Sequence, residues 1–217
     1  MSWIGFSLLA TITWSISNIG DKIVLTRWVK SPLIPLMVVN GVGFVVAVVI
    51  LLRKGMPMVP THLLGWVVLT SIVAVLSAFC YYKATQRQEI SRVVPLFYLA
   101  PVVVTVLARI FLLEQFPFST YVGVALLISG AIAISSSQLF PLRLGAAFWW
   151  MMGAMASVAA YDVLIKYLLG FADFWTVFAW MRVGALLICL PIFFRTIPSF
   201  SALIYSNQIG FRMSHTQ

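Results

Sequence analysis

Long apolar runs alternate with short polar segments along the whole of this 217-residue chain. A transmembrane helix needs roughly 20 mainly apolar residues to cross about 30 Å of hydrocarbon. Seven runs approach that length, and they cover residues 3–25, 33–52, 63–82, 93–113, 121–137, 144–168 and 174–194. Turn formers such as Ser31-Pro32 and Gly55 separate the runs, so the loops are short. The pattern predicts an all-α integral membrane protein of about seven transmembrane helices.

Composition agrees with this fold class and excludes a soluble domain. Hydrophobic residues make up 62% of the chain and charged residues 9%, whereas about a quarter of an average soluble chain is charged. The formal charge of +9 is dispersed among loops and spans and forms no basic face. The expected partner is therefore the lipid bilayer and not nucleic acid.

The chain carries no recognisable pattern of catalytic or cofactor chemistry. Its five acidic residues are scattered, and His62 and His215 are far apart in the sequence. Cys80 and Cys189 both lie inside apolar runs, where a small buried side chain is more common than a disulfide or a metal ligand. We therefore expect no enzyme activity, no metal and no cofactor.

Residues of the first apolar run recur at a constant offset in the sixth. The first copy comprises Ala10, Thr13, Asn18, Lys22 and Leu25, and the second comprises Ala154, Ser157, Asp162, Lys166 and Leu169. Five spans separate the starts of the copies, so the second enters the membrane from the opposite side. This is the pattern of the inverted repeats found in secondary transporters, and chance similarity between two apolar helices is the alternative.

A further set of residues extends from the third to the fifth predicted span. It comprises Tyr81-Tyr82-Lys83-Ala84, Val94-Pro95-Leu96, Leu99-Ala100-Pro101, Phe111-Leu112-Leu113-Glu114, Gly123 and Gly130. In these residues the chain resembles the EamA-like domain of the drug/metabolite transporter superfamily. The resemblance implies transport of small metabolites such as amino acids or nucleosides, across what we expect to be a bacterial cytoplasmic (inner) membrane.

The family's usual architecture has ten spans, and the resemblance divides this chain accordingly. Residues 1–140 are expected to form a complete five-span repeat, residues 141–198 the first two spans of an inverted second repeat, and residues 199–217 a polar tail. On this reading the chain is truncated after seven spans and transports little by itself. A multidrug-efflux or lipid-carrier flippase-like relative, and a product that no longer transports, are the alternatives.

Two departures from the family pattern affect the interpretation. Leu113 stands before the acidic residue Glu114, where the family often has glycine. The first span also lacks the buried glutamate on which the small multidrug-resistance branch depends. Proton-coupled drug antiport by that route is therefore not expected.

Polar residues inside the spans are the candidates for a substrate cavity, because ionisable groups in hydrocarbon need partners or water. Trp14, Asn18 and Lys22 share a face of the first helix, and Asp162 and Lys166 share the equivalent face of the sixth. If these helices cross near the midplane, Asp162 approaches Lys22 as an ion pair. The alternative is that both lysines lie near helix ends and extend to the lipid headgroups.

The remaining cavity candidates lie in the third and fourth spans. Tyr82 and Tyr98 are placed to contact a polar solute, although anchoring at the membrane interface also explains Tyr82. Pro101 is expected to kink the fourth helix, because proline cannot donate a backbone hydrogen bond. Kinked helices line substrate paths in transporters, and a kink that serves packing alone is the alternative.

Small residues follow one face of the fifth span and predict close helix packing. The stripe consists of Gly123, Ala125, Ser129, Gly130 and Ala133. Small side chains let helix backbones approach closely in a membrane, either within one chain or between two copies as a homodimer.

Orientation in the membrane stays open. Basic residues are more numerous in the loops on the side of Arg27 and Lys30, which by the positive-inside rule places the N-terminus outside. The family resemblance implies the opposite arrangement, with both ends cytoplasmic.

Overall fold

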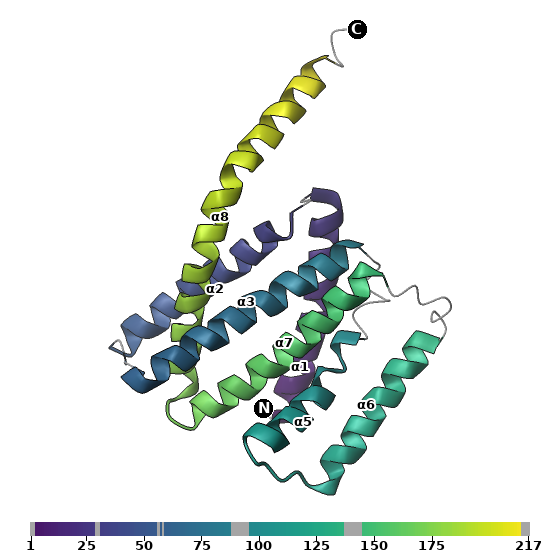
Figure 1. Cartoon of the computed structure of the whole chain (residues 1–217), viewed down its shortest axis with the longest axis vertical. Coiled ribbons are helices and arrows are strands. Elements are labelled where there is room, and N and C mark those ends of the chain that lie inside the picture. The colour runs from purple at the N-terminus through teal and green to yellow at the C-terminus, as the bar shows by residue number, and fades with distance from the viewer. Residues whose placement is uncertain are drawn as a thin grey trace.

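The computed structural model describes residues 3–28, 31–55, 57, 59–87, 96–136 and 145–213, and every regular element among them is helical (Figure 1). The elements are α1 Trp3–Ile23, the π-helical turn η1 Val24–Trp28, α2 Leu33–Arg53, the 3-10 turn η2 Thr61–Leu63, α3 Leu64–Arg87, α5 Ala100–Phe111, α6 Phe118–Ser136, α7 Ala146–Leu169 and α8 Phe174–Met213. Val94 and Pro95, near the predicted start of the fourth span, lie outside the described residues.

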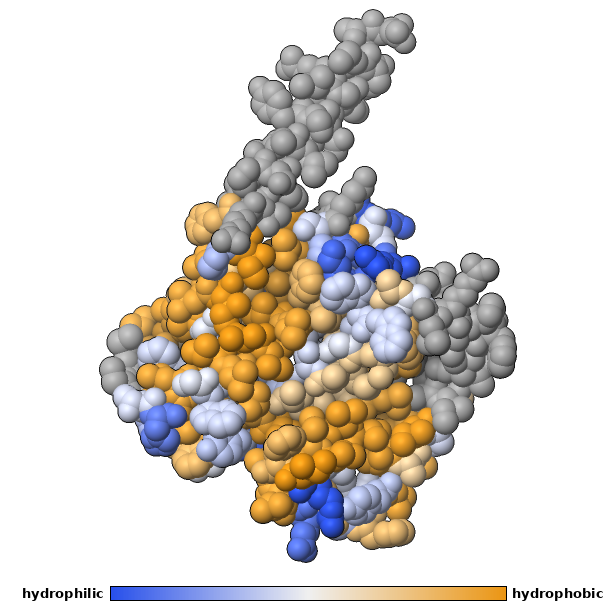
Figure 2. All heavy atoms as spheres, viewed as in Figure 1, coloured by the Kyte–Doolittle hydropathy of each residue, from blue (hydrophilic) through white to orange (hydrophobic). Residues whose placement is uncertain are grey.

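The predicted helical membrane fold is confirmed. In the described part of the chain, four helices are long and apolar enough to cross a membrane: Leu33–Arg53, Thr61–Arg87, Ala146–Leu169 and Phe174–Ile192. Figure 2 shows apolar residues over most of the coloured surface, and side chains such as Val45, Leu52 and Leu126 are more than 60% exposed. Such surface is stable against lipid and not against water. The count of seven spans stays a prediction.

Helix α3 lies at the centre of the fold and packs against both α7 and α8. The hydroxyl of Ser77 donates to the carbonyl of Ala154, and the ring of Trp66 lies 5.3 Å from that of Tyr167. Residues early in α3 thus contact residues late in α7, so these two helices are antiparallel. Their contact buries small and apolar residues together, including Ala84, Ala147 and Met151.

The contact between α3 and α8 is close because a glycine faces a serine. Ser71 is fully buried, and its hydroxyl donates to the carbonyls of Val67 and Met181. A Cβ added to Gly184 would lie 2.5 Å from the Ser71 oxygen and 3.1 Å from its Cβ. The glycine therefore sets the distance between the two backbones.

Helix α8 also packs along α2, in the antiparallel direction. Asn40 lies near Cys189, and Leu51 packs with Ala179. Arg182 lies inside the apolar run, and its side chain packs over Gly43. A Cβ added to Gly43 would lie 2.8 Å from the Arg182 Cδ. The guanidinium lies 5.1 Å from the centre of the Phe178 ring, so an aromatic face is one contact of this intramembrane charge.

The direction of α1 relative to α7 follows from contacts through α3. Asn18 lies beside Tyr81, and Lys22 lies beside Thr85. Residue numbers rise together in these contacts, so α1 is parallel to α3 and therefore antiparallel to α7. This is the relative direction that an inverted repeat requires, while the division into repeats stays a prediction.

Contrary to expectation, Pro101 does not bend the interior of one continuous helix, because the helix is interrupted just before it. Leu96 and Phe97 are helical, Tyr98 and Leu99 form a turn, and α5 begins at Ala100 with Pro101 in its first turn. Helix backbones lack amide partners in the first turn, so proline is tolerated there. At 12 residues, α5 is about 18 Å long and does not cross a bilayer by itself.

Two further elements differ from expectation. Helix α8 does not end near Phe194 but continues to Met213, 40 residues in all, because neither Pro191 nor the polar residues that follow terminate it. Helix α6 lies at the edge of the fold (Figure 1), and nothing lies within 4 Å of a Cβ built on Gly123 or Gly130. The predicted close approach is therefore not made at these two glycines within the described chain, and pairing with a second copy stays a prediction.

Leu113, which stands where the family often has glycine, has a left-handed backbone conformation. Leu113, at the end of α5, has a φ of 54° and is 82% exposed. The amides of Leu112 and Glu114 both donate to the carbonyl of Ala108, which closes the helix end. A left-handed backbone costs roughly 1–2 kcal/mol for a residue with a Cβ and little for glycine.

Leu113→Gly should stabilise the protein by roughly 0.5–1 kcal/mol, because it removes that strain and loses little packing. The measurement is thermal unfolding of the purified protein in detergent. Leu112→Gly is the control and should destabilise, since Leu112 has a φ of −102°. A lower melting temperature for Leu113→Gly would contradict this account of the turn.

Gly184→Ala should destabilise the fold by about 1–3 kcal/mol, because the new methyl group overlaps Ser71. Gly123→Ala, at a glycine with open space around it, should be neutral or slightly stabilising. Thermal unfolding of both variants, together with the rescue variant Ser71→Gly/Gly184→Ala, measures the difference. Equal effects of the two glycine substitutions would show that α3 and α8 do not approach as described.

Candidate functional site

A cluster of hydrogen-bonded polar side chains lies between α1, α3 and the turn before α5. Asn18 is 6% exposed, and its carboxamide oxygen accepts a hydrogen bond from the hydroxyl of Tyr81 at 2.8 Å. Its amide nitrogen donates to the hydroxyl oxygen of Tyr98 at 3.2 Å. Asn18 therefore joins three segments that are far apart in the sequence.

Lys22 lies one helical turn beyond Asn18 and reaches the same face of α3. Its ammonium donates to the backbone carbonyl of Thr85 at 2.6 Å. Thr85 is fully buried, and its hydroxyl donates to the carbonyl of Tyr81 at 3.0 Å. Because α1 and α3 are parallel here, residues four apart on one helix meet residues four apart on the other. We call Asn18, Lys22, Tyr81, Thr85 and Tyr98 the polar cluster.

Aromatic rings border the polar cluster. The rings of Tyr81 and Tyr82 are 5.4 Å apart, and that of Phe97 is 5.7 Å from Tyr81. Tyr81 and Tyr82 are buried, whereas Tyr98 is 41% exposed. An amide, an ammonium and phenol groups can exchange their mutual hydrogen bonds for bonds to a polar molecule, and the rings can contact its apolar part.

The structure brings some of the predicted cavity residues together and separates others. Asn18, Lys22 and Tyr98 meet in the polar cluster, and Tyr82 lies beside it. Trp14 is 53% exposed on the surface of α1. Pro101 is exposed at the start of α5, and Asp162 is exposed on α7.

The expected ion pair between Lys22 and Asp162 does not form. Among the described residues the ion pairs are Lys54–Asp173 and Lys166–Glu114. The reason is the central position of α3: Lys22 reaches α3, and α7 packs against α3 and α5. Lys166, the repeat equivalent of Lys22, consequently meets Glu114 at 2.6 Å.

Tyr81 and Thr85 were not among the predicted site residues. Tyr81 stood in the family-like pattern beside Tyr82, and its spacing of four from Thr85 matches that of Asn18 and Lys22. That shared spacing is a signal for facing residues on parallel helices. The shared spacing can predict which residues face each other only when the relative direction of the two helices is known.

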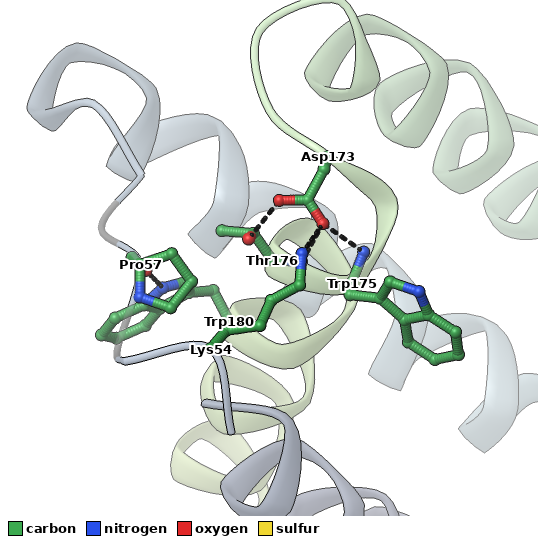
Figure 3. Close-up of polar contacts among 6 residues, drawn as sticks. All are labelled: Lys54, Pro57, Asp173, Trp175, Thr176 and Trp180. Carbon is green, nitrogen blue, oxygen red and sulfur yellow. Dashed lines mark hydrogen bonds and ion pairs between the residues drawn. The ribbon is translucent and has the colours of Figure 1, made fainter. Parts of the chain in front are cut away.

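A second set of polar contacts joins α2 to α8 at the other end of the bundle (Figure 3). Lys54 pairs with Asp173, which also accepts hydrogen bonds from the amides of Trp175 and Thr176 and from the Thr176 hydroxyl. Asp173 thus caps the start of α8. The bonds from Lys54 and Thr176 lower the pKa of its carboxyl to about 2. The indole of Trp180 donates to the carbonyl of Pro57 at 2.8 Å.

Metal ligation finds no support in these arrangements. Among the described residues, no group of three or more His, Cys, Asp or Glu side chains is placed to hold a metal ion.

These features define a class of protein: a helical integral membrane protein with buried polar side chains between packed helices. The family model described as the EamA-like transporter family matches residues 1–136, more than half of the chain. The chain therefore belongs to the EamA-like transporter family, whose members are transporters of small solutes in the drug/metabolite transporter superfamily.

A curated relative gives the same extent of similarity. An uncharacterized protein of Methanocaldococcus jannaschii is 29% identical over 132 residues, which are 60% of this chain and 94% of the relative. No solved structure matches the chain.

Proposed function

We propose that this protein is a secondary transporter that moves a small polar metabolite, such as an amino acid or a nucleoside, across the cytoplasmic membrane. The observation that carries the proposal is the polar cluster, because buried polar groups inside a membrane are expensive and mark solute paths. Family membership supplies the transport activity in general. The chemistry of the cluster supports a polar solute.

The polar cluster suits a solute with hydrogen-bonding groups better than an apolar drug or a lipid. Asn18 offers both a donor and an acceptor, Lys22 offers a positive charge, and the tyrosine hydroxyls can act in either sense. A solute with a carboxylate or several hydroxyl groups can satisfy these groups when it displaces their present partners. An apolar drug would leave them unsatisfied, at a cost of about 1–3 kcal/mol for each group. We therefore favour metabolite transport over multidrug efflux.

Uptake by proteoliposomes tests this function. The probes are radiolabelled amino acids and nucleosides, compared between vesicles with the purified protein and vesicles without it. We expect at least one probe to enter faster with the protein. Tyr81→Phe should then raise its KM about two- to tenfold, because it removes a hydroxyl that now bonds Asn18 and would bond the solute.

A matched control comes from the other face of α1. Thr13 is exposed and bonds its own helix at Leu9, so Thr13→Ala should leave uptake unchanged. Asn18→Ala should reduce uptake more than Tyr81→Phe does, because it removes both bonds of the carboxamide. Equal uptake by Asn18→Ala and the unsubstituted protein would exclude the polar cluster as the binding site.

A further inference from the structure

Both ion pairs of the described residues lie at one end of the bundle. Lys54 follows the end of α2, Glu114 follows the end of α5, and Lys166 stands in the last turn of α7. Asp173 precedes α8, a few residues after Lys166. The polar cluster lies toward the opposite end, because Thr85 is close to the end of α3 while the ion pairs lie near its start.

Each ion pair joins the first half of the chain, α1 to α6, to the second half, α7 and α8. Lys54 on the first half meets Asp173 on the second, and Glu114 on the first meets Lys166 on the second. The hydrogen bonds that join Asn18 to Tyr81 and Tyr98 and Lys22 to Thr85 stay inside the first half. Among the described residues, both ion pairs between the halves therefore lie at the same end of the bundle.

An apolar layer lies directly beneath these pairs. Leu63, Leu168 and Val177 are at most 2% exposed, and they come from both halves. Further along α3, Ser71 packs against Gly184 and Ser77 bonds to Ala154. The close small-residue contacts lie between the apolar layer and the polar cluster, where they can act as a pivot on which the ends of the helices separate.

We propose that the ion pairs Lys54–Asp173 and Glu114–Lys166 form a gate that closes one membrane face of the protein and opens during transport. The side chains are between 27% and 55% exposed, so each attraction is weak and reversible. Opening the gate exposes the apolar layer at Val177 to water. The proposal rests on the proposed transport function and assigns Lys166, a predicted cavity residue, to the gate.

Labelling of a reporter cysteine tests the gate without any solute. The reporter is Val177→Cys in a protein with Cys80→Ala and Cys189→Ala, reconstituted in nanodiscs so that both faces are accessible. The probe is a hydrophilic maleimide. Lys54→Gln and Glu114→Gln should each raise the labelling rate about two- to fivefold, the change expected for loss of one exposed ion pair.

Two further measurements test the gate: exchange of the two charges of one ion pair, and a change of ionic strength that needs no substitution in the gate. Glu114→Lys/Lys166→Glu should return labelling to the rate of the reporter protein. Raising the ionic strength to about 1 M should accelerate labelling of the reporter protein itself, because screening weakens exposed pairs. Lys83→Gln is the control: Lys83 lies over the Phe79 ring on the later part of α3 and should not alter the rate.

The proposal is overturned if the gate variants label at the reporter protein's rate, if Lys83→Gln accelerates labelling equally, or if salt has no effect. If the labelling rate changes as expected but the protein shows no uptake, the gate is supported and the proposed function is contradicted. If uptake is observed but the gate variants do not change the labelling rate, the gate is contradicted and the proposed function is not. The two ideas therefore fail separately.

Discussion

The close contact of α3 with α7 and α8 is the constraint on which the rest of the structure depends. Lipid tails are as apolar as leucine, so helices in a membrane associate through packing and hydrogen bonds. Gly184 lets the α8 backbone approach Ser71, and the hydroxyl of Ser77 bonds to the Ala154 carbonyl on α7. These contacts fix both neighbours of α3 and place α2 and α5 around them.

The position of α3 also separates the charges of the two halves. Lys22 and Lys166 are equivalent in the predicted repeat, yet Lys22 donates to a backbone carbonyl inside the first half and Lys166 pairs with a carboxylate between halves. One lysine stands in the polar cluster and the other at the opposite end. The same residue type at equivalent positions can therefore serve binding at one face and closure at the other.

The sequence predicted what depends on local pattern and missed what depends on tertiary contact. Apolar run lengths located α1, α2, α3, α7 and the first part of α8, and the spacing of Asn18 and Lys22 placed both on one face. Their partners could not be predicted, because the direct approach of α1 to α7 was assumed and α3 takes that place. Pro101 was expected inside a continuous helix, whereas the helix is interrupted at Tyr98 and Leu99 and begins again at Ala100. The structure in turn shows that Leu113 has the backbone conformation that glycine adopts more easily.

Disulfide trapping tests the central position of α3 most directly. In a protein with Cys80→Ala and Cys189→Ala, the pair Ser77→Cys/Ala154→Cys is compared with Asn18→Cys/Asp162→Cys under the same oxidant in membranes. Contact of α3 with α7 predicts rapid crosslinking of the first pair and none of the second. Crosslinking between positions 18 and 162 but not between 77 and 154 would contradict the account, because α1 would then hold the place assigned to α3.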